Sequence, residues 1–303
     1  MTQTNDAHPE TTARNAARTV RWVTLWGLGA NLVLAAIKFV AGVAAHSQAL
    51  IADAFHSLSD SATDIVVIIG APFWAAPADA DHPYGHGRIE TMVTVFIGAA
   101  LALVGLGLAY NALATLAAED KSTPGWLAFV VACVSIVLKE GLYRWTARVG
   151  RRLRSSALAA NAWHHRSDAF SSVPVAVAVL GSHVQPAWTF LDHVAALLVA
   201  VMILQAAWRI VAPAMQQLSD AGVTEAERTA LDVLVRETRG VRSAHGLRTR
   251  RLGPDLYVDL HVLVDPSLTV HEGHEIARAV KRRLLREGED VVDVLVHIEP
   301  FEE

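Results

Sequence analysis

The stretch that decides the fold is "IADAFHSLSDSATD", residues 51–64. Long apolar segments lie on both sides of it, yet it carries Asp53, His56, Asp60 and Asp64. A charged side chain at membrane depth costs about 3 kcal/mol on insertion scales, and it persists where it faces a bundle interior and serves an ion pathway. The stretch therefore predicts a membrane helix that carries part of an ion site.

Composition divides the sequence into a membrane part and a soluble part. Of the 303 residues, 52% are hydrophobic and 18% are charged, against about 25% charged in a typical soluble domain; the mean hydropathy is +0.32. The charges gather at the N-terminus, in short connectors and after about Ser219. The net charge of −4 gives no case for a nucleic-acid partner, and the single Cys133 excludes a disulfide framework within one chain.

Six segments have the roughly 20 mostly apolar residues that a helix needs to cross a bilayer. We expect them at residues 22–45, 49–74, 89–117, 126–147, 157–180 and 190–215. Basic residues gather before the first segment and after the second and fourth: Arg14, Arg18, Arg21, Arg88, Arg148, Arg151, Arg152 and Arg154. Positive residues favour the cytoplasmic side, so both termini are expected in the cytoplasm. Residues 1–20 are expected to be a disordered tail and not a signal peptide.

The pattern changes after the last apolar segment. Residues 224–239 and 267–287 have helical spacing, whereas residues 255–265 and 290–300 alternate as strands do, with residues 243–253 as a partner strand. The order helix–strand–strand–helix–strand predicts a small α+β domain over residues 217–303, after a membrane domain over residues 21–216.

Two pairs of ionisable residues lie in separate apolar segments. His56 and Asp60 are four residues apart and share one helix face, and "NAWHHRSDAF" repeats the arrangement with His164 and Asp168. Two imidazoles and two carboxylates match the ligand count of a tetrahedral Zn²⁺ site. Spacing alone leaves His165 open in place of His164, and it leaves open a proton relay without metal.

The connector "ADADHPYGHGRIE" holds a second cluster of metal-ligand types. His82 and His86 flank a Pro–Tyr–Gly turn, and Asp79 and Asp81 lie nearby. Both imidazoles and a carboxylate can converge on a cation in such a loop. A solvated polar loop is the alternative interpretation.

The soluble domain contains a third cluster: His245, His261, His271, His274, His297 and Glu299. His297 and Glu299 are two apart on a predicted strand, so they share a face. Ordinary surface histidines are the alternative. The sequence "HEGH" is one residue short of the H-E-x-x-H motif, which excludes a metalloprotease interpretation.

Together these motifs resemble the cation diffusion facilitator family. The resemblance rests on "ALIADAFHSLSD", "DHPYGHGRIE", "HHRSDAFSS", the soluble "VRSAHGLRTRRLGPDLYVDLHVLVD" and "DVLVHIEP", and it covers nearly the whole chain after residue 20. It implies a six-transmembrane α-helical bundle followed by a cytoplasmic α+β domain of the ferredoxin or metallochaperone type, through which subunits form a homodimer. It also implies a secondary active transporter of the inner membrane, not an enzyme, that exports Zn²⁺ or related divalent ions in exchange for protons.

The resemblance implies three groups of metal ligands, in the bundle, the loop and the soluble domain: His56, Asp60, His164, Asp168; Asp79, His82, His86; His245, His261, His274, His297. It thereby favours His164 over His165. The family often has an aspartate where Glu299 stands, and His271 has no clear counterpart. The resemblance also pairs Arg88, where a lysine is more usual, with Asp220.

Metal identity and protein class are decided by the intramembrane ligands. Two imidazoles with two carboxylates suit Zn²⁺ first, with Cd²⁺, Co²⁺, Fe²⁺ or Ni²⁺ as alternatives, and His56 argues against Mn²⁺. A non-transporting membrane metal sensor would not need both intramembrane pairs. A primary pump would need a phosphate-binding motif, and the sequence has no G-x-x-x-x-G-K-[ST]. Lys38 and Glu140 are interpreted as side chains that reach the membrane interface.

Overall fold

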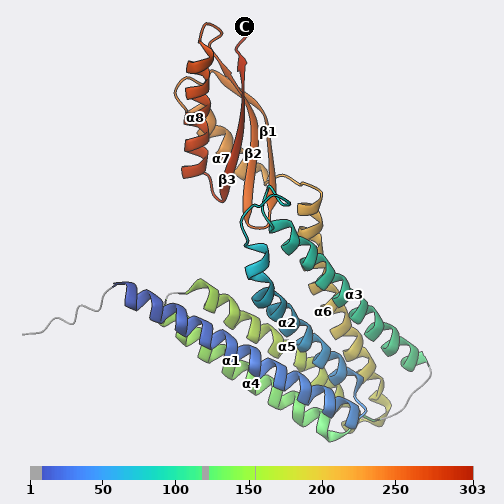
Figure 1. Ribbon diagram of the computed structural model, residues 1–303. Helices are drawn as coiled ribbons and strands as arrows, with labels where there is room; N and C mark the ends of the chain where they lie inside the picture. The colour runs from blue at the N-terminus through green and yellow to red at the C-terminus, as the bar shows by residue number, and fades with distance from the viewer. Residues whose placement is uncertain (1–8, 118–122, 154, 303) are drawn as a thin grey trace, which may run out of the picture. The chain divides into compact units, whose positions relative to one another are not determined.

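The computed structural model describes residues 9–117, 123–153 and 155–302. The first eight residues of the expected tail, and Arg154, lie outside the described residues. The first part of the chain forms long helices (Figure 1): α1 (Pro9–Ala44), α2 (Gln48–Trp74), α3 (Gly87–Ala117), α4 (Trp126–Leu153), α5 (Ser156–Val184), the short 3₁₀ helix η1 (Pro186–Trp188) and α6 (Phe190–Leu218). Helix α1 starts before the first expected span, which begins at residue 22. The residues of α1 that precede this span are rich in alanine and arginine, which are good helix formers.

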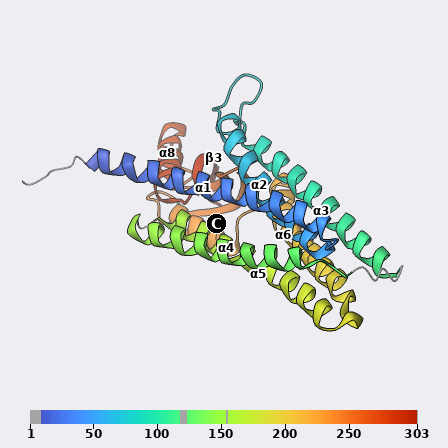
Figure 2. The same cartoon turned by 90° about the horizontal axis from the view of Figure 1, so that it is seen from below.

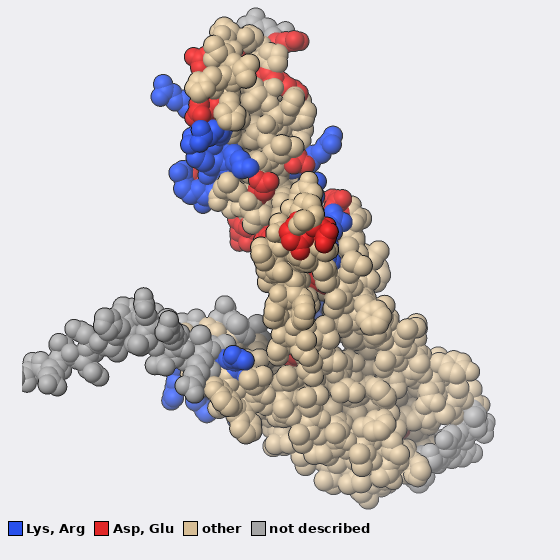
Figure 3. Space-filling view, viewed as in Figure 1, with Lys and Arg blue, Asp and Glu red and all other residues tan. Residues whose placement is uncertain are grey.

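Four helices in the described residues are long and apolar enough to cross a membrane: α1 from Arg21 to Ala44, α3, α4 and α6. Helices α2 and α5 fall short of that measure because they carry the ionisable residues that the sequence singles out. The six helices together form the expected helical transmembrane domain. Figure 3 shows one face of the molecule, on which the surface of the long helices is largely free of Lys, Arg, Asp and Glu.

The chain divides into two compact units, residues up to 68 with 99–207, and residues 69–98 with 208 onward. In the first unit, α1, α4 and α5 run side by side (Figures 1 and 2). Small residues fill the interior, and Ala49, Ala52, Ala128 and Ala132 are completely buried. Such side chains let the helix backbones approach closely, as they do in membrane bundles. Polar side chains on these helices are therefore held at short range.

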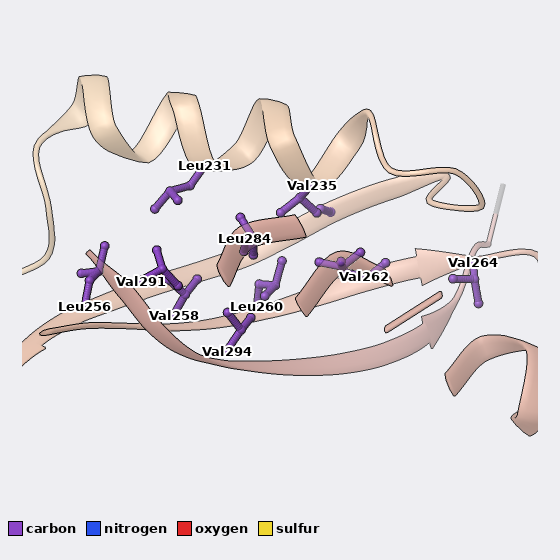
Figure 4. Packing of buried hydrophobic residues seen from close by; sticks show 12 residues of the cluster. Leu231, Val235, Leu256, Val258, Leu260, Val262, Val264, Leu284, Val291 and Val294 are labelled. Atoms are coloured by element: carbon purple, nitrogen blue, oxygen red, sulfur yellow. The ribbon is translucent and has the colours of Figure 1, made fainter. Parts of the chain in front are cut away.

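The C-terminal domain has the element order that the sequence predicts: α7 (Glu225–Arg236), β1 (Ser243–Leu252), β2 (Asp255–Val264), α8 (Val270–Glu287) and β3 (Val291–Pro300). The sheet order is β1-β2-β3, with β1 and β2 antiparallel and β2 and β3 parallel. Every second residue of β2 is buried. These side chains pack against α7 and α8, where Val235 and Leu284 are fully buried (Figure 4). The domain therefore has its own core.

Both helices of this domain begin with a capping box. Thr224 and Glu227 cap α7, and Thr269 and Glu272 cap α8. The Thr269 backbone N–H donates to the Glu272 carboxylate at 2.8 Å and lowers the pKa of Glu272. Because the pKa is lower in the folded state, ionised Glu272 contributes to stability at pH values above its unfolded-state pKa. This contribution is lost as the pH falls through the folded-state pKa.

Replacing Thr269 with alanine is expected to destabilise α8 by about 1 kcal/mol, because the N-cap hydroxyl that accepts from the Glu272 N–H is removed. Hydrogen exchange of the α8 amides in the full chain should accelerate about five-fold. Thr269→Ser keeps the hydroxyl and is the control. Equal exchange in the alanine and serine variants would show that this cap is not stabilising.

Candidate metal centres

Helices α2 and α5 bring the two intramembrane pairs together. The ligand atoms of His56, Asp60 and Asp168 all lie within 4.8 Å of one another. His56 Nε2 is 4.0 Å from Asp60 Oδ2, and His164 Nδ1 is 3.7 Å from Asp168 Oδ1. Each pair shares a helix face as its spacing predicts, and the two faces meet. The common point thus comprises His56 and Asp60 of α2 and Asp168 of α5, and His164 is connected to it through its contact with Asp168.

Burial leaves part of this cluster without hydrogen-bond partners. The Asp168 side chain is only 3% exposed, and Asp60 Oδ2 and His56 Nδ1 are buried with no partner in the described residues. A buried polar atom without a partner is unfavourable by about 1–3 kcal/mol. Nearby carboxylate and imidazole lone pairs that are not hydrogen-bonded are available to a cation.

His165 is not in this cluster and lies against α1. Its ring is buried, and its Nε2 lies 3.0 Å from the place where a side chain at Gly27 of α1 would begin. The absence of a side chain at Gly27 therefore leaves the space that the His165 imidazole fills. His164 is the neighbour whose ring nitrogen faces Asp168. The geometry thus favours His164 over His165, the choice that spacing alone leaves open.

Lys139 of α4 contacts the intramembrane cluster, and the sequence pattern does not predict this contact. Its side chain is completely buried, and its Nζ donates to Asp168 Oδ2 at 2.5 Å. The one sequence signal for Lys139 is that a lysine stands inside an apolar span. The sequence interpretation selects the adjacent Glu140 instead and assigns it to the membrane interface. Glu140 is 30% exposed and accepts from Arg144 at 2.8 Å.

Lys38 does not reach the membrane interface, so that expectation is wrong. Its side chain is completely buried, and its Nζ lies 2.8 Å from Asp53 Oδ2. The Lys38 ammonium also donates to Ser57 and Ser172, and Asp53 accepts from Ser171 and Ser172. Asp53 is therefore the partner of a buried lysine, held by hydroxyl donors on α5.

The loop residues expected to bind a cation also converge. The ligand atoms of Asp79, His82 and His86 lie within 4.8 Å of one another, and Asp79 is 3.3 Å from His82 Nδ1 and 3.4 Å from His86 Nε2. Asp79 Oδ1 accepts the backbone N–H groups of His82 and Asp81. The His82 N–H lowers the pKa of Asp79 most. The carboxylate is thus held ionised between two imidazoles, whereas Asp81 contributes only its backbone.

The second unit anchors this loop to the C-terminal domain. Arg88 donates to Asp220 at 2.6 Å, the pairing that the family resemblance implies. The Tyr84 and Tyr257 rings meet edge to face at 5.9 Å, and the Arg250 guanidinium lies 5.4 Å from the Tyr84 ring and 5.8 Å from the Tyr257 ring. Aromatic and cation–π contacts therefore supplement the ion pair.

The third cluster depends on strand register. His245, His261 and His297 are paired side by side across β1, β2 and β3. Glu299 lies 2.8 Å from His245 Nε2, 2.6 Å from His261 Nδ1 and 3.7 Å from His297 Nε2. The His245 and His261 hydrogen bonds lower the pKa of Glu299. The irregularity after His245 includes Gly246, whose φ of 64° suits glycine.

The two histidines of α8 stand apart from this row. The group of ligand atoms within 4.8 Å of one another consists of His245, His261 and Glu299 in the described residues. His274 instead lines a surface hollow that also borders Glu299. The structure of one chain thus places two of the four soluble-domain histidines that the resemblance implies in the group, with His297 3.7 Å from Glu299 and His274 apart.

Known proteins match the chain along its length. The family model of the cation efflux transmembrane domain matches residues 25–219, and that of the cation efflux protein cytoplasmic domain matches residues 223–301. Metal tolerance protein C1 of Arabidopsis thaliana is 36% identical over 289 residues, which cover 90% of this chain and 61% of that protein. The chain thus spans less than two thirds of this plant relative.

Bacterial relatives are matched over nearly their whole length. The manganese efflux system protein MneS of Bacillus subtilis is 32% identical over 280 residues, covering 92% of this chain and 95% of MneS. The magnetosome protein MamB of Magnetospira sp. (strain QH-2) is 31% identical over 278 residues, covering 92% of this chain and 94% of MamB.

Proposed function

Because the chain belongs to the cation diffusion facilitator family of divalent-metal efflux transporters, we propose that it exports Zn²⁺ from the cytoplasm in exchange for protons. The family consists of multi-pass membrane transporters and not of enzymes. The observation that carries the proposal is the convergence of His56, Asp60 and Asp168 between α2 and α5, with the His164 imidazole 3.7 Å from Asp168 as the fourth ligand. Four such ligands are the number that a tetrahedral Zn²⁺ takes.

Ligand chemistry supports Zn²⁺ as the cargo. Imidazole nitrogen suits Zn²⁺ and other borderline ions, whereas an all-oxygen set suits Mn²⁺. The likeness to the manganese efflux protein MneS makes Mn²⁺ the second candidate. His56 and His164 together favour Zn²⁺ over Mn²⁺.

The same histidines supply proton exchange. A metal ligand must be deprotonated, so metal binding releases protons. An unperturbed imidazole has a pKa near 6.5 and changes charge close to physiological pH. In this mechanism Zn²⁺ enters from the cytoplasm and displaces protons, the bundle opens to the other side, and protons there displace the metal. The chain lies in the inner membrane with both termini in the cytoplasm.

Uptake into proteoliposomes tests the function. With an imposed pH gradient, Zn²⁺, Mn²⁺, Fe²⁺ and Co²⁺ are supplied side by side to the purified full-length protein. Zn²⁺ is expected to enter fastest, and collapse of the gradient with an ionophore is expected to stop uptake. Fast gradient-driven Mn²⁺ uptake with little Zn²⁺ uptake would transfer the assignment to Mn²⁺. Uptake that ignores the gradient would disprove proton exchange.

The C-terminal cluster is proposed to regulate transport. It consists of His245, His261, His297 and Glu299, on the three-stranded sheet of a domain whose family model is a dimerisation domain. Zn²⁺ bound there as its cytoplasmic concentration rises would tighten the homodimer. The loop group of Asp79, His82 and His86 would take metal at the cytoplasmic side.

Replacing Glu299 with alanine is expected to weaken Zn²⁺ binding by the C-terminal cluster at least ten-fold. Glu299 contacts three imidazoles, so its loss removes one ligand and the acceptor that orients two rings. Calorimetric Zn²⁺ titration of residues 217–303, which have their own core, measures the change. His271→Ala, an exposed histidine of α8, is the control. Equal affinity in the two variants would remove Glu299 from the ligand set.

A further inference from the structure

The transmembrane bundle contains two completely buried lysines with different surroundings. The Lys38 ammonium has three partners, namely Asp53, Ser57 and Ser172. Among the described residues, the Lys139 ammonium donates its hydrogen bond to Asp168. Lys38 is therefore held in a saturated network. The charge of Lys139 is balanced by a carboxylate of the intramembrane cluster.

Asp168 divides its two oxygens between the lysine and the cluster. Oδ2 accepts from Lys139 at 2.5 Å, and Oδ1 lies 3.7 Å from His164 Nδ1. Asp168 is also within 4.8 Å of the ligand atoms of His56 and Asp60. A divalent ion bound at this point therefore lies beside the Lys139 charge. Lys139 and Asp168 are both buried, so water screens the repulsion between the ammonium and such an ion little.

Lys139 changes the charge of the empty and the loaded site. With both carboxylates ionised and both imidazoles neutral, Asp60, Asp168 and Lys139 carry a net charge of −1, and a divalent ion brings it to +1. Without the lysine the charges are −2 and 0. Excess charge is unfavourable in a buried site. The lysine therefore disfavours the loaded state and favours the empty one.

We propose that Lys139 is a built-in counter-cation of the intramembrane site, which neutralises Asp168 when no metal is bound and weakens the hold on a divalent ion. This inference rests on the proposed function. A transporter must release its cargo, and a buried site of two carboxylates and two imidazoles would otherwise trap it. Lys139 is a positioning residue that sets affinity without being a ligand.

An orienting role is the competing explanation. A ligating carboxylate is commonly fixed by a hydrogen bond from a neighbouring residue, and loss of that hydrogen bond weakens metal affinity about 10- to 100-fold. The two roles predict opposite signs. Lys139→Gln separates them, because glutamine keeps an N–H donor for Asp168 and removes the charge.

The test is metal titration of the full-length protein in detergent against a chromophoric chelator, at fixed pH and salt, with Zn²⁺ and with Mn²⁺. The binding component that Asp60→Asn abolishes is assigned to the intramembrane site. In Lys139→Gln this component is expected to tighten at least ten-fold for both ions, because the effect is electrostatic. In transport assays the half-saturating Zn²⁺ concentration and the maximal rate should both fall, since release becomes slow.

Arg166→Gln is the charge-matched control. Arg166 lies on α5 but is 36% exposed and stacks on Tyr143, so its charge is screened. Its removal is expected to change affinity less than two-fold. If Lys139→Gln fails to fold, Lys139→Met, which fills the space with an apolar chain, carries the same expectation.

Unchanged or weaker affinity in Lys139→Gln overturns the inference, and so does equal tightening in Arg166→Gln. These outcomes are distinct from a failure of the proposed function. If Asp60→Asn keeps the wild-type binding and uptake, the intramembrane site itself is misassigned. If Asp60→Asn loses both and Lys139→Gln shows no tightening, only the role of Lys139 is refuted.

Discussion

Replacing Asp60 with asparagine is expected to reduce pH-gradient-driven Zn²⁺ uptake at least 100-fold. Asp60 Oδ2 is buried without a hydrogen-bond partner, and it lies among the ligand atoms of His56 and Asp168. Asparagine has nearly the same shape but no charge, so the site loses one of two carboxylates while the bundle keeps its packing. A 100-fold loss corresponds to about 2.7 kcal/mol, which is modest for the removal of an anionic ligand.

Asp64 provides the matched control on the same helix. It lies four residues after Asp60, is exposed, and stands outside the group of ligand atoms. Asp64→Asn is expected to retain uptake within three-fold of the wild type. Size-exclusion chromatography of both variants should show the same oligomer as the wild type. Gradient-driven Zn²⁺ uptake that persists in Asp60→Asn would reject the intramembrane assignment.

Local periodicity explains which parts of the site are predictable. A spacing of four residues places His56 with Asp60, and His164 with Asp168, on one helix face whatever the tertiary fold. Alternation likewise predicts β2, because every second residue must enter the core. Helical spacing alone leaves the choice between His164 and His165 open, because the position of the His165 ring depends on the space that Gly27 provides on another helix.

Contacts between elements are the part that the sequence does not predict. Lys139 and Asp168 are 29 residues apart, and their pairing depends on how α4 and α5 rotate about their axes. Neighbouring residues on a helix point about 100° apart, so Lys139 is completely buried while Glu140 is partly exposed. The alignment of His245, His261 and His297 similarly depends on register, which a strand pattern alone does not determine.

Replacing Lys38 with methionine is expected to destabilise the bundle by about 3–5 kcal/mol, the range for removal of one partner of a buried ion pair. The substitution leaves Asp53 completely buried, and its donors among the described residues are then the hydroxyl groups of Ser171 and Ser172. The unfolding midpoint, followed by tryptophan fluorescence in detergent, should fall on the order of 10 °C for a domain of this size. Lys281→Met is the control, because Lys281 pairs with Asp293 at 2.6 Å on the exposed surface and such pairs contribute about 0–1 kcal/mol.

The double variant Lys38→Met/Asp53→Asn separates loss of charge balance from loss of packing. Asparagine is neutral and still accepts from the serine hydroxyls, so most of the lost stability should return. The coupling arises because the penalty lies in the unpaired carboxylate and not in the lysine chain, whose volume methionine replaces. If the double variant is no more stable than Lys38→Met, the Lys38–Asp53 pair is not the source of the stability. A Lys38→Met midpoint equal to that of the wild type would show that Asp53 tolerates burial without its lysine.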